Sequence, residues 1–171
     1  MSDLRATALF DITTRDPHPN ALAGLMVILD VKNPPPVGLG GTPTPGTIVK
    51  GNVLMMDSAD GKAILGDSAL HIPATAPQMY VFAVDGDTDL DGAFLHRVTC
   101  IEGGMQMKTD QYDTGGGAYL AGEALTVGTG AQVGILVHLA GLAEPLLGFV
   151  GPGGVLPDGS LDVIVPQGRC R

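Results

Sequence analysis

The chain has 171 residues, enough for one domain with a real core, and its 44% hydrophobic content excludes an intrinsically disordered chain. Charged residues make up only 16%, and 26 glycines and 13 prolines are present, which disfavours long solvent-facing helices and favours short strands with frequent turns. The net charge of −9, without any basic cluster, argues against direct nucleic-acid binding.

Residues 1–46 are expected to form an N-terminal arm, a first strand and a Pro/Gly-rich loop. Asp16-Pro17-His18-Pro19 forbids a continuing helix and favours extended backbone, so residues 1–20 are predicted to be an arm or an edge strand. Leu25–Leu29 is a short, partly β-branched apolar run and predicts a buried strand. Residues 37–46 are rich in Gly and Pro and predict a stiff surface loop.

Residues 47–171 are predicted to form a β-rich main domain, because short apolar runs alternate with turn signals. Asp60-Gly61 predicts a hairpin, Glu102-Gly103-Gly104 predicts another, and Gly151-Pro152-Gly153-Gly154 predicts a turn. The expected strands are Thr47–Met56, Lys62–Leu65, Met79–Val84, Ala93–Ile101, Met105–Tyr112, Ala118–Val127, Val133–Leu139, Pro145–Val150 and Leu161–Val165. We therefore predict an all-β fold, a small β-sandwich or β-barrel with an extended, Pro-rich N-terminal arm or loop.

The sequence also predicts the conformation of residues 134–147 and the orientation of two methionines in this domain. Residues 134–147 are apolar enough for a short buried helix or for strands, and Gly141 and Pro145 favour strand-turn-strand. Met105 and Met107 alternate with Gln106 and Lys108, so both methionines should point to one face of a sheet and pack in the core.

The sharpest local motif is the run of alternate aspartates Asp87, Asp89 and Asp91, followed by Gly92. Three carboxylates on one side of a tight turn resemble the first half of a calcium loop, but the closing bidentate Glu is replaced by Val98 and the flanks look like strands. The sequence therefore favours a solvated acidic loop, and any calcium bound by these aspartates should bind weakly.

Other catalytic signatures are weak. The four histidines, His18, His71, His96 and His138, are not at ligand spacing, and no serine lies in a Gly-x-Ser-x-Gly elbow. Cys100 and Cys170 lie far apart and are expected to be free thiols. The first apolar run is too short for a signal peptide or a membrane span. We expect a protein that is not an enzyme, uses no cofactor other than calcium if any, and is synthesised in the cytoplasm.

The order of motifs in the second half resembles the decoration and structural proteins of tailed-phage heads. The motifs that carry this resemblance are Val81–Asp87, Phe94–Val98, Tyr119–Val127 and Glu144–Val150, within residues 47–165. The resemblance implies a capsid decoration, or cement, protein on the exterior of the virion head. It also implies binding to the major capsid protein as a homotrimer, and no contact with nucleic acid or membrane.

The sequence is also compatible with two other functions. A phage tail or fibre module, or another surface-binding β module, would share the Gly-rich composition. A small hydrolase or lyase on a β scaffold would require Asp87, Asp89 and Asp91 to converge with His96 in a closed cleft.

Overall fold

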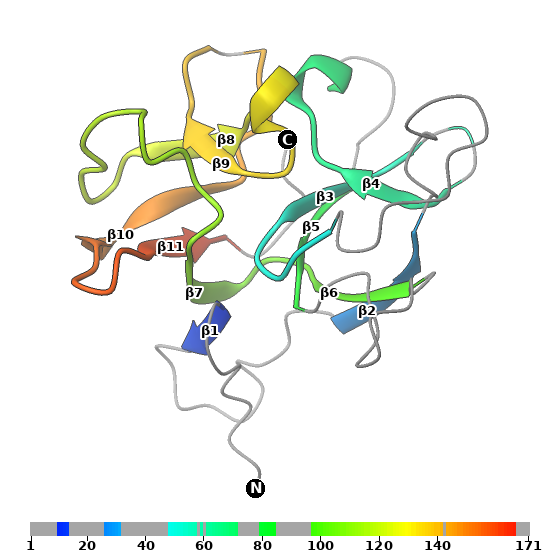
Figure 1. Cartoon of the computed structure of the whole chain (residues 1–171), viewed down its shortest axis with the longest axis horizontal. Coiled ribbons are helices and arrows are strands. Elements are labelled where there is room, and N and C mark those ends of the chain that lie inside the picture. The colour runs from blue at the N-terminus through cyan, green and yellow to red at the C-terminus, as the bar shows by residue number, and fades with distance from the viewer. Residues whose placement is uncertain are drawn as a thin grey trace, which may run out of the picture.

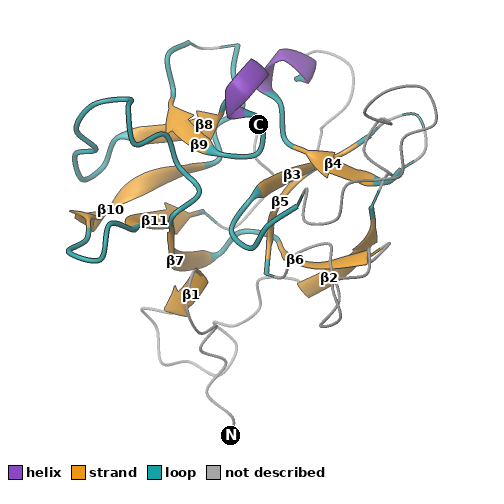
Figure 2. Cartoon of the chain, in the orientation of Figure 1, coloured by secondary structure: helices purple, strands orange, loops and turns teal. Residues whose placement is uncertain are grey.

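The computed structural model of the chain describes residues 10–13, 26–31, 48–57, 59, 61–71, 79–84, 97–141 and 143–166 (Figure 1). Within these residues the structure holds eleven β-strands and two short 3-10 helices, η1 (Ser68–Leu70) and η2 (Gly130–Gln132). The strands form two antiparallel sheets, and the predicted all-β class is confirmed (Figure 2).

One sheet has six strands in the order β1-β7-β11-β10-β8-β9, and the other has five in the order β2-β6-β5-β3-β4. The six-stranded sheet contains β1 (Phe10–Thr13), β7 (Met105–Thr109), β8 (Ala124–Val127), β9 (Leu136–His138), β10 (Gly148–Val155) and β11 (Leu161–Val165). The five-stranded sheet contains β2 (Met26–Asp30), β3 (Val53–Met56), β4 (Ala63–Leu65), β5 (Tyr80–Ala83) and β6 (Arg97–Ile101). Their packing face to face gives a β-sandwich.

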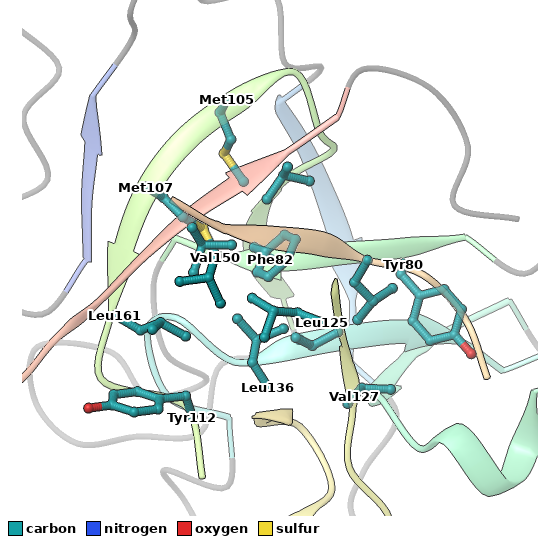
Figure 3. Close-up of a cluster of buried hydrophobic side chains, with 14 of the residues drawn as sticks. Tyr80, Phe82, Met105, Met107, Tyr112, Leu125, Val127, Leu136, Val150 and Leu161 are labelled. Atoms are coloured by element: carbon teal, nitrogen blue, oxygen red, sulfur yellow. The ribbon is translucent and has the colours of Figure 1, made fainter. Parts of the chain in front are cut away.

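The main core lies between the two sheets (Figure 3). Successive side chains of a strand point to opposite faces, so alternate residues of strands such as β5, β7 and β11 enter this layer. Phe82 from the five-stranded sheet and Leu125 and Leu136 from the six-stranded sheet are among its fully buried members. Met105 and Met107 are buried here while Gln106 and Lys108 are only half-buried, which confirms the predicted alternation.

The five-stranded sheet is buried on its outer face as well. Leu54, Val81, Val98 and Cys100 form a second apolar cluster there and expose 1% or less of their surface. A sheet that is covered on both faces needs strands without polar alternation. This explains why Val53–Met55 and Tyr80–Ala83 appear in the sequence as continuous apolar runs.

A buried polar side chain joins the two sheets at one corner. Asn52, just before β3, donates from Nδ2 to the carbonyl of Gly134 and to Oε1 of Gln111, each at 3.1 Å, and its Oδ1 accepts the N–H of Val49 at 2.8 Å. Gly134 also accepts the N–H of Val53 at 2.8 Å. Gly134 has a φ of +78°, which favours glycine, so the corner depends on this residue type.

Replacing Asn52 with alanine should lower the free energy of unfolding by about 2 kcal/mol, because several hydrogen bonds, worth about 1 kcal/mol each, would be lost. Urea unfolding followed by circular dichroism measures this change. Gln111→Ala removes only one of these bonds and should have less than half the effect. Equal losses for the two variants would contradict the central role of Asn52.

Three sequence predictions are wrong in detail. Glu102-Gly103-Gly104 does not close a hairpin, because β6 and β7 belong to different sheets and the chain crosses between the sheets here. Residues 151–154 are not a turn but part of β10, which has a register irregularity between Val150 and Val155, and the turn follows at residues 157–159. Strand β8 begins at Ala124, so residues 118–123 are a loop and not strand.

Other local predictions are confirmed. β3 and β4 form the hairpin expected around Asp60-Gly61, and residues 134–147 contain strand β9 but no helix among those described. Strand β2 nearly coincides with the predicted Leu25–Leu29 strand. The Pro/Gly-rich segment 37–46 lies outside the described residues, as do His18 and Cys170.

Candidate docking surface

The aspartates proposed for calcium, Asp87, Asp89 and Asp91, lie outside the described residues, together with His96. In the part of the chain that the structure describes, no group of three or more His, Cys, Asp or Glu side chains could hold a metal ion.

Ser160 directly follows the turn at residues 157–159 that joins β10 to β11. Its Oγ donates to Oδ1 of Asp158 at 2.6 Å, and Lys108 Nζ donates to Oδ2 of the same carboxylate at 3.2 Å. The hydroxyl and amide of Ser160, with a smaller contribution from Lys108, lower the pKa of Asp158 to about 2. The hydroxyl therefore serves to hold the turn between β10 and β11.

The most exposed large apolar side chain among the described residues belongs to Leu120, which is 63% exposed. It lies in the segment 113–123, which joins β7 to β8 and runs along the left of Figure 1 in yellow-green. We call this segment the Leu120 loop. A single exposed leucine is ordinary on a protein surface. Leu120 is a candidate for a docking contact only if the loop around it is held in a fixed conformation.

The first half of the Leu120 loop is closed by Asp113. Its Oδ1 accepts the N–H of Gly115 at 2.9 Å, and its carbonyl accepts the N–H of Gly116 at 3.2 Å. Such side-chain turns are typical of aspartate. Gly117 has a φ of +103°, a conformation that L side chains rarely adopt, so the chain reverses on a glycine.

Tyr119 anchors the middle of the loop in the main core, where it is only 5% exposed. Its ring stacks on His138 of β9 at a centroid distance of 4.0 Å and meets Tyr112 edge-on at 5.2 Å. Its hydroxyl donates to the carbonyl of Asp113 at 2.9 Å. Tyr112, drawn in Figure 3, donates in turn to the carbonyl of Gly159 at 2.9 Å. The residue before Leu120 is thus fixed by packing and by a hydrogen bond.

Glu123 fixes the backbone of Leu120 itself. The N–H of Leu120 donates to Oε2 of Glu123 at 2.8 Å, and the N–H of Glu123 donates to the carbonyl of Leu120 at 3.1 Å. The same Oε2 lies 3.6 Å from Nδ1 of His138, so the carboxylate joins the loop to β9. The exposed leucine is therefore presented on a loop that is braced on both sides.

Strand β10 lies beside the end of the loop. Gly122 donates to the carbonyl of Val150, and Val150 donates to the carbonyl of Glu123, each at 2.8 Å. A Cβ atom on Gly154 would lie 3.3 Å from the carbonyl of Tyr119, so β10 follows the loop closely at this point as well. Val155, the next residue, is 46% exposed. The two segments that carry the exposed Leu120 and Val155 are therefore neighbours.

The environment of Tyr119 also changes its ionisation. Burial raises the pKa of Tyr119 from 10.0 to about 12, and the nearby charges of Asp113, Tyr112 and Glu123 act in the same direction. Because an ionised phenolate would be poorly solvated there, the neutral tyrosine is the form that the fold stabilises.

Stability should therefore fall as pH rises from about 10 to about 12. In this window the unfolded chain loses the Tyr119 proton while the folded chain keeps it, so ionisation favours unfolding by an amount of the order of 2 kcal/mol. Tyr119→Phe should be about 1 kcal/mol less stable than the natural chain at pH 7, because it lacks one hydrogen bond, and should show a shallower fall at alkaline pH. Thermal melts of both proteins between pH 7 and pH 12 test this, and parallel curves would contradict it.

The sequence pattern predicted a strand over Ala118–Val127 and did not indicate the Leu120 loop. Comparison of the chain with protein-family profiles, with curated proteins and with solved structures gave no match. Among the described residues, no helix is long and apolar enough to cross a membrane.

Proposed function

We propose that this protein is a structural binding protein that decorates the outer surface of an assembled tailed-phage head and stabilises it without catalysis. The observation that supports a docking role is the exposed Leu120 on its braced loop. The choice of the major capsid protein as partner rests on the resemblance of the strand motifs in Val81–Val150 to head decoration proteins.

A braced apolar side chain is well suited to docking. Binding loses free energy when a mobile loop must become ordered, and a loop that is already held by Tyr119 and Glu123 avoids most of this loss. Burial of Leu120 against a partner would then contribute about 25 cal/mol for each Å² of apolar surface removed from water. Val155 on the neighbouring strand would extend the contact.

Repetition would make weak contacts sufficient. A shell offers many identical sites, and a protein that binds only the assembled state stabilises that state by mass action. Linking several copies into one symmetric oligomer, which we propose is a trimer, raises the effective affinity further. The net charge of −9 would favour a basic partner surface and would keep neighbouring copies apart where they do not touch.

The direct test mixes the purified protein with undecorated, expanded heads. We expect regular density on the outer shell by electron cryomicroscopy and rupture of the heads at a higher temperature than without the protein. An unrelated acidic protein of similar size is the control. A bare shell and an unchanged rupture temperature would refute the proposal and favour the tail or fibre alternative.

The proposed trimer has its own test. Sedimentation equilibrium of the free protein should give three times the mass of the 17.4 kDa chain. A monomer at all concentrations would refute the trimer in solution, although the decoration test would still decide whether the protein binds heads.

A further inference from the structure

The two N-terminal strands, β1 and β2, pair antiparallel with two consecutive later strands that belong to different sheets. Strand β1 pairs with β7 from Phe10↔Thr109 to Thr13↔Gln106, and β2 pairs with β6 from Met26↔Ile101 to Asp30↔Arg97. Because β6 and β7 are consecutive, β1 and β2 pair with the two sides of the point where the chain crosses from one sheet to the other.

The two sides of this crossing differ in length. Between the paired positions, the later segment uses the four residues 102–105, whereas the N-terminal segment uses the twelve residues 14–25. The connection between β1 and β2 is therefore three times as long as the connection 102–105 between the residues with which they pair. Twelve residues can span about 40 Å when extended, at about 3.3 Å per residue, which is enough to reach a neighbouring molecule.

Strand β1 is also the edge of its sheet. It pairs with β7 alone, and no strand among the described residues lies beyond it. Its removal would leave the remaining order β7-β11-β10-β8-β9 intact, but it would open the backbone of β7 along its edge. An open edge recruits another strand, and the strand whose register already matches this edge is β1, so a second copy of β1 fits it.

We infer that β1 is exchanged between copies, so that β1 of one molecule pairs with β7 of the next. The strand pairing and register of β1 on β7 are the same in the closed and exchanged forms. The balance between these forms depends on the entropy of the connecting segment and on the local protein concentration. Exchange from copy to copy around a ring would produce a closed symmetric oligomer. This inference does not require that the partner be a phage head.

Two variants, each with one introduced cysteine in addition to the buried Cys100, test the exchange, because Asp11 lies opposite Lys108 in the β1–β7 register. Asp11→Cys and Lys108→Cys, each with Cys170→Ser and a different affinity tag, are unfolded together, refolded at high concentration and oxidised. Exchange predicts a covalent dimer that carries both tags, with a disulfide between positions 11 and 108 identified by peptide mass spectrometry.

The matched control mixes Asp11→Cys with Leu70→Cys, since Leu70 is exposed on η1, beyond the five-stranded sheet. This pair measures disulfides that form by random collision. A yield of the 11–108 dimer at least tenfold above this control supports exchange. A yield equal to the control overturns it, and the double variant Asp11→Cys/Lys108→Cys should then give only a monomer with an internal disulfide.

The exchange test and the decoration test can fail independently of each other. Proteins that bind heads but form only internal disulfides would refute the exchange and leave the proposed function standing. Exchanged oligomers that do not bind to heads would support the exchange and refute the proposed function.

Discussion

Replacing Phe82 with alanine should lower the free energy of unfolding by about 4 kcal/mol, within the usual range for a buried phenylalanine. Phe82 lies on β5, is 2% exposed and belongs to the core cluster between the two sheets (Figure 3). It is paired with Val53 on one side and Ile101 on the other, so neighbouring backbone on both sides prevents the sheet from closing around the lost ring. A domain with a total stability of about 5–15 kcal/mol would become marginal.

Phe149→Ala is the matched control, because it removes the same ring from β10 at a position that is only half-buried. Its loss should be less than half that of Phe82→Ala. Urea unfolding of both variants, with circular dichroism and fluorescence as independent probes, gives the two values and tests two-state behaviour. Equal losses would show that the space between the sheets is not the main source of stability.

The strand positions could largely be predicted from the sequence, because apolar runs and turn residues are local signals. The pairing of strands could not. Glu102-Gly103-Gly104 has turn chemistry, but the same residues suit a crossing between sheets, where a Cβ atom on Gly103 would overlap the carbonyl of Pro166. The partner strands that distinguish the two outcomes are distant in sequence, such as β11, about sixty residues later in the chain, which pairs with β7.

The Leu120 loop could not be predicted from the sequence for a related reason. Tyr119, Leu120 and the apolar residues that follow match a strand pattern, and nothing local shows that Tyr119 turns inward against Tyr112 and His138. Glu123, three residues after Leu120, and the glycines at 115–117 are the signals in the sequence that could have indicated a braced loop. The calcium prediction at Asp87, Asp89 and Asp91 rests on local spacing alone and lies outside the described residues.

The functional prediction with the largest expected effect concerns Leu120 itself. Leu120→Asp should weaken binding to expanded heads by at least about 30-fold, because a central apolar contact contributes about 2 kcal/mol or more and a buried unpaired carboxylate opposes binding further. The folded protein should be almost unaffected, within about 0.5 kcal/mol, because the side chain is 63% exposed. Binding is measured by cosedimentation with heads over a range of protein concentrations.

Leu70→Asp provides the matched control for this experiment. Leu70 is 50% exposed on η1, outside the Leu120 loop, so the same change in charge and polarity is made on another surface. If general charge repulsion or solubility governs binding, both variants should lose affinity equally. If the Leu120 loop docks on the shell, only Leu120→Asp should do so, and an unchanged affinity for that variant would remove this loop from the proposed interface.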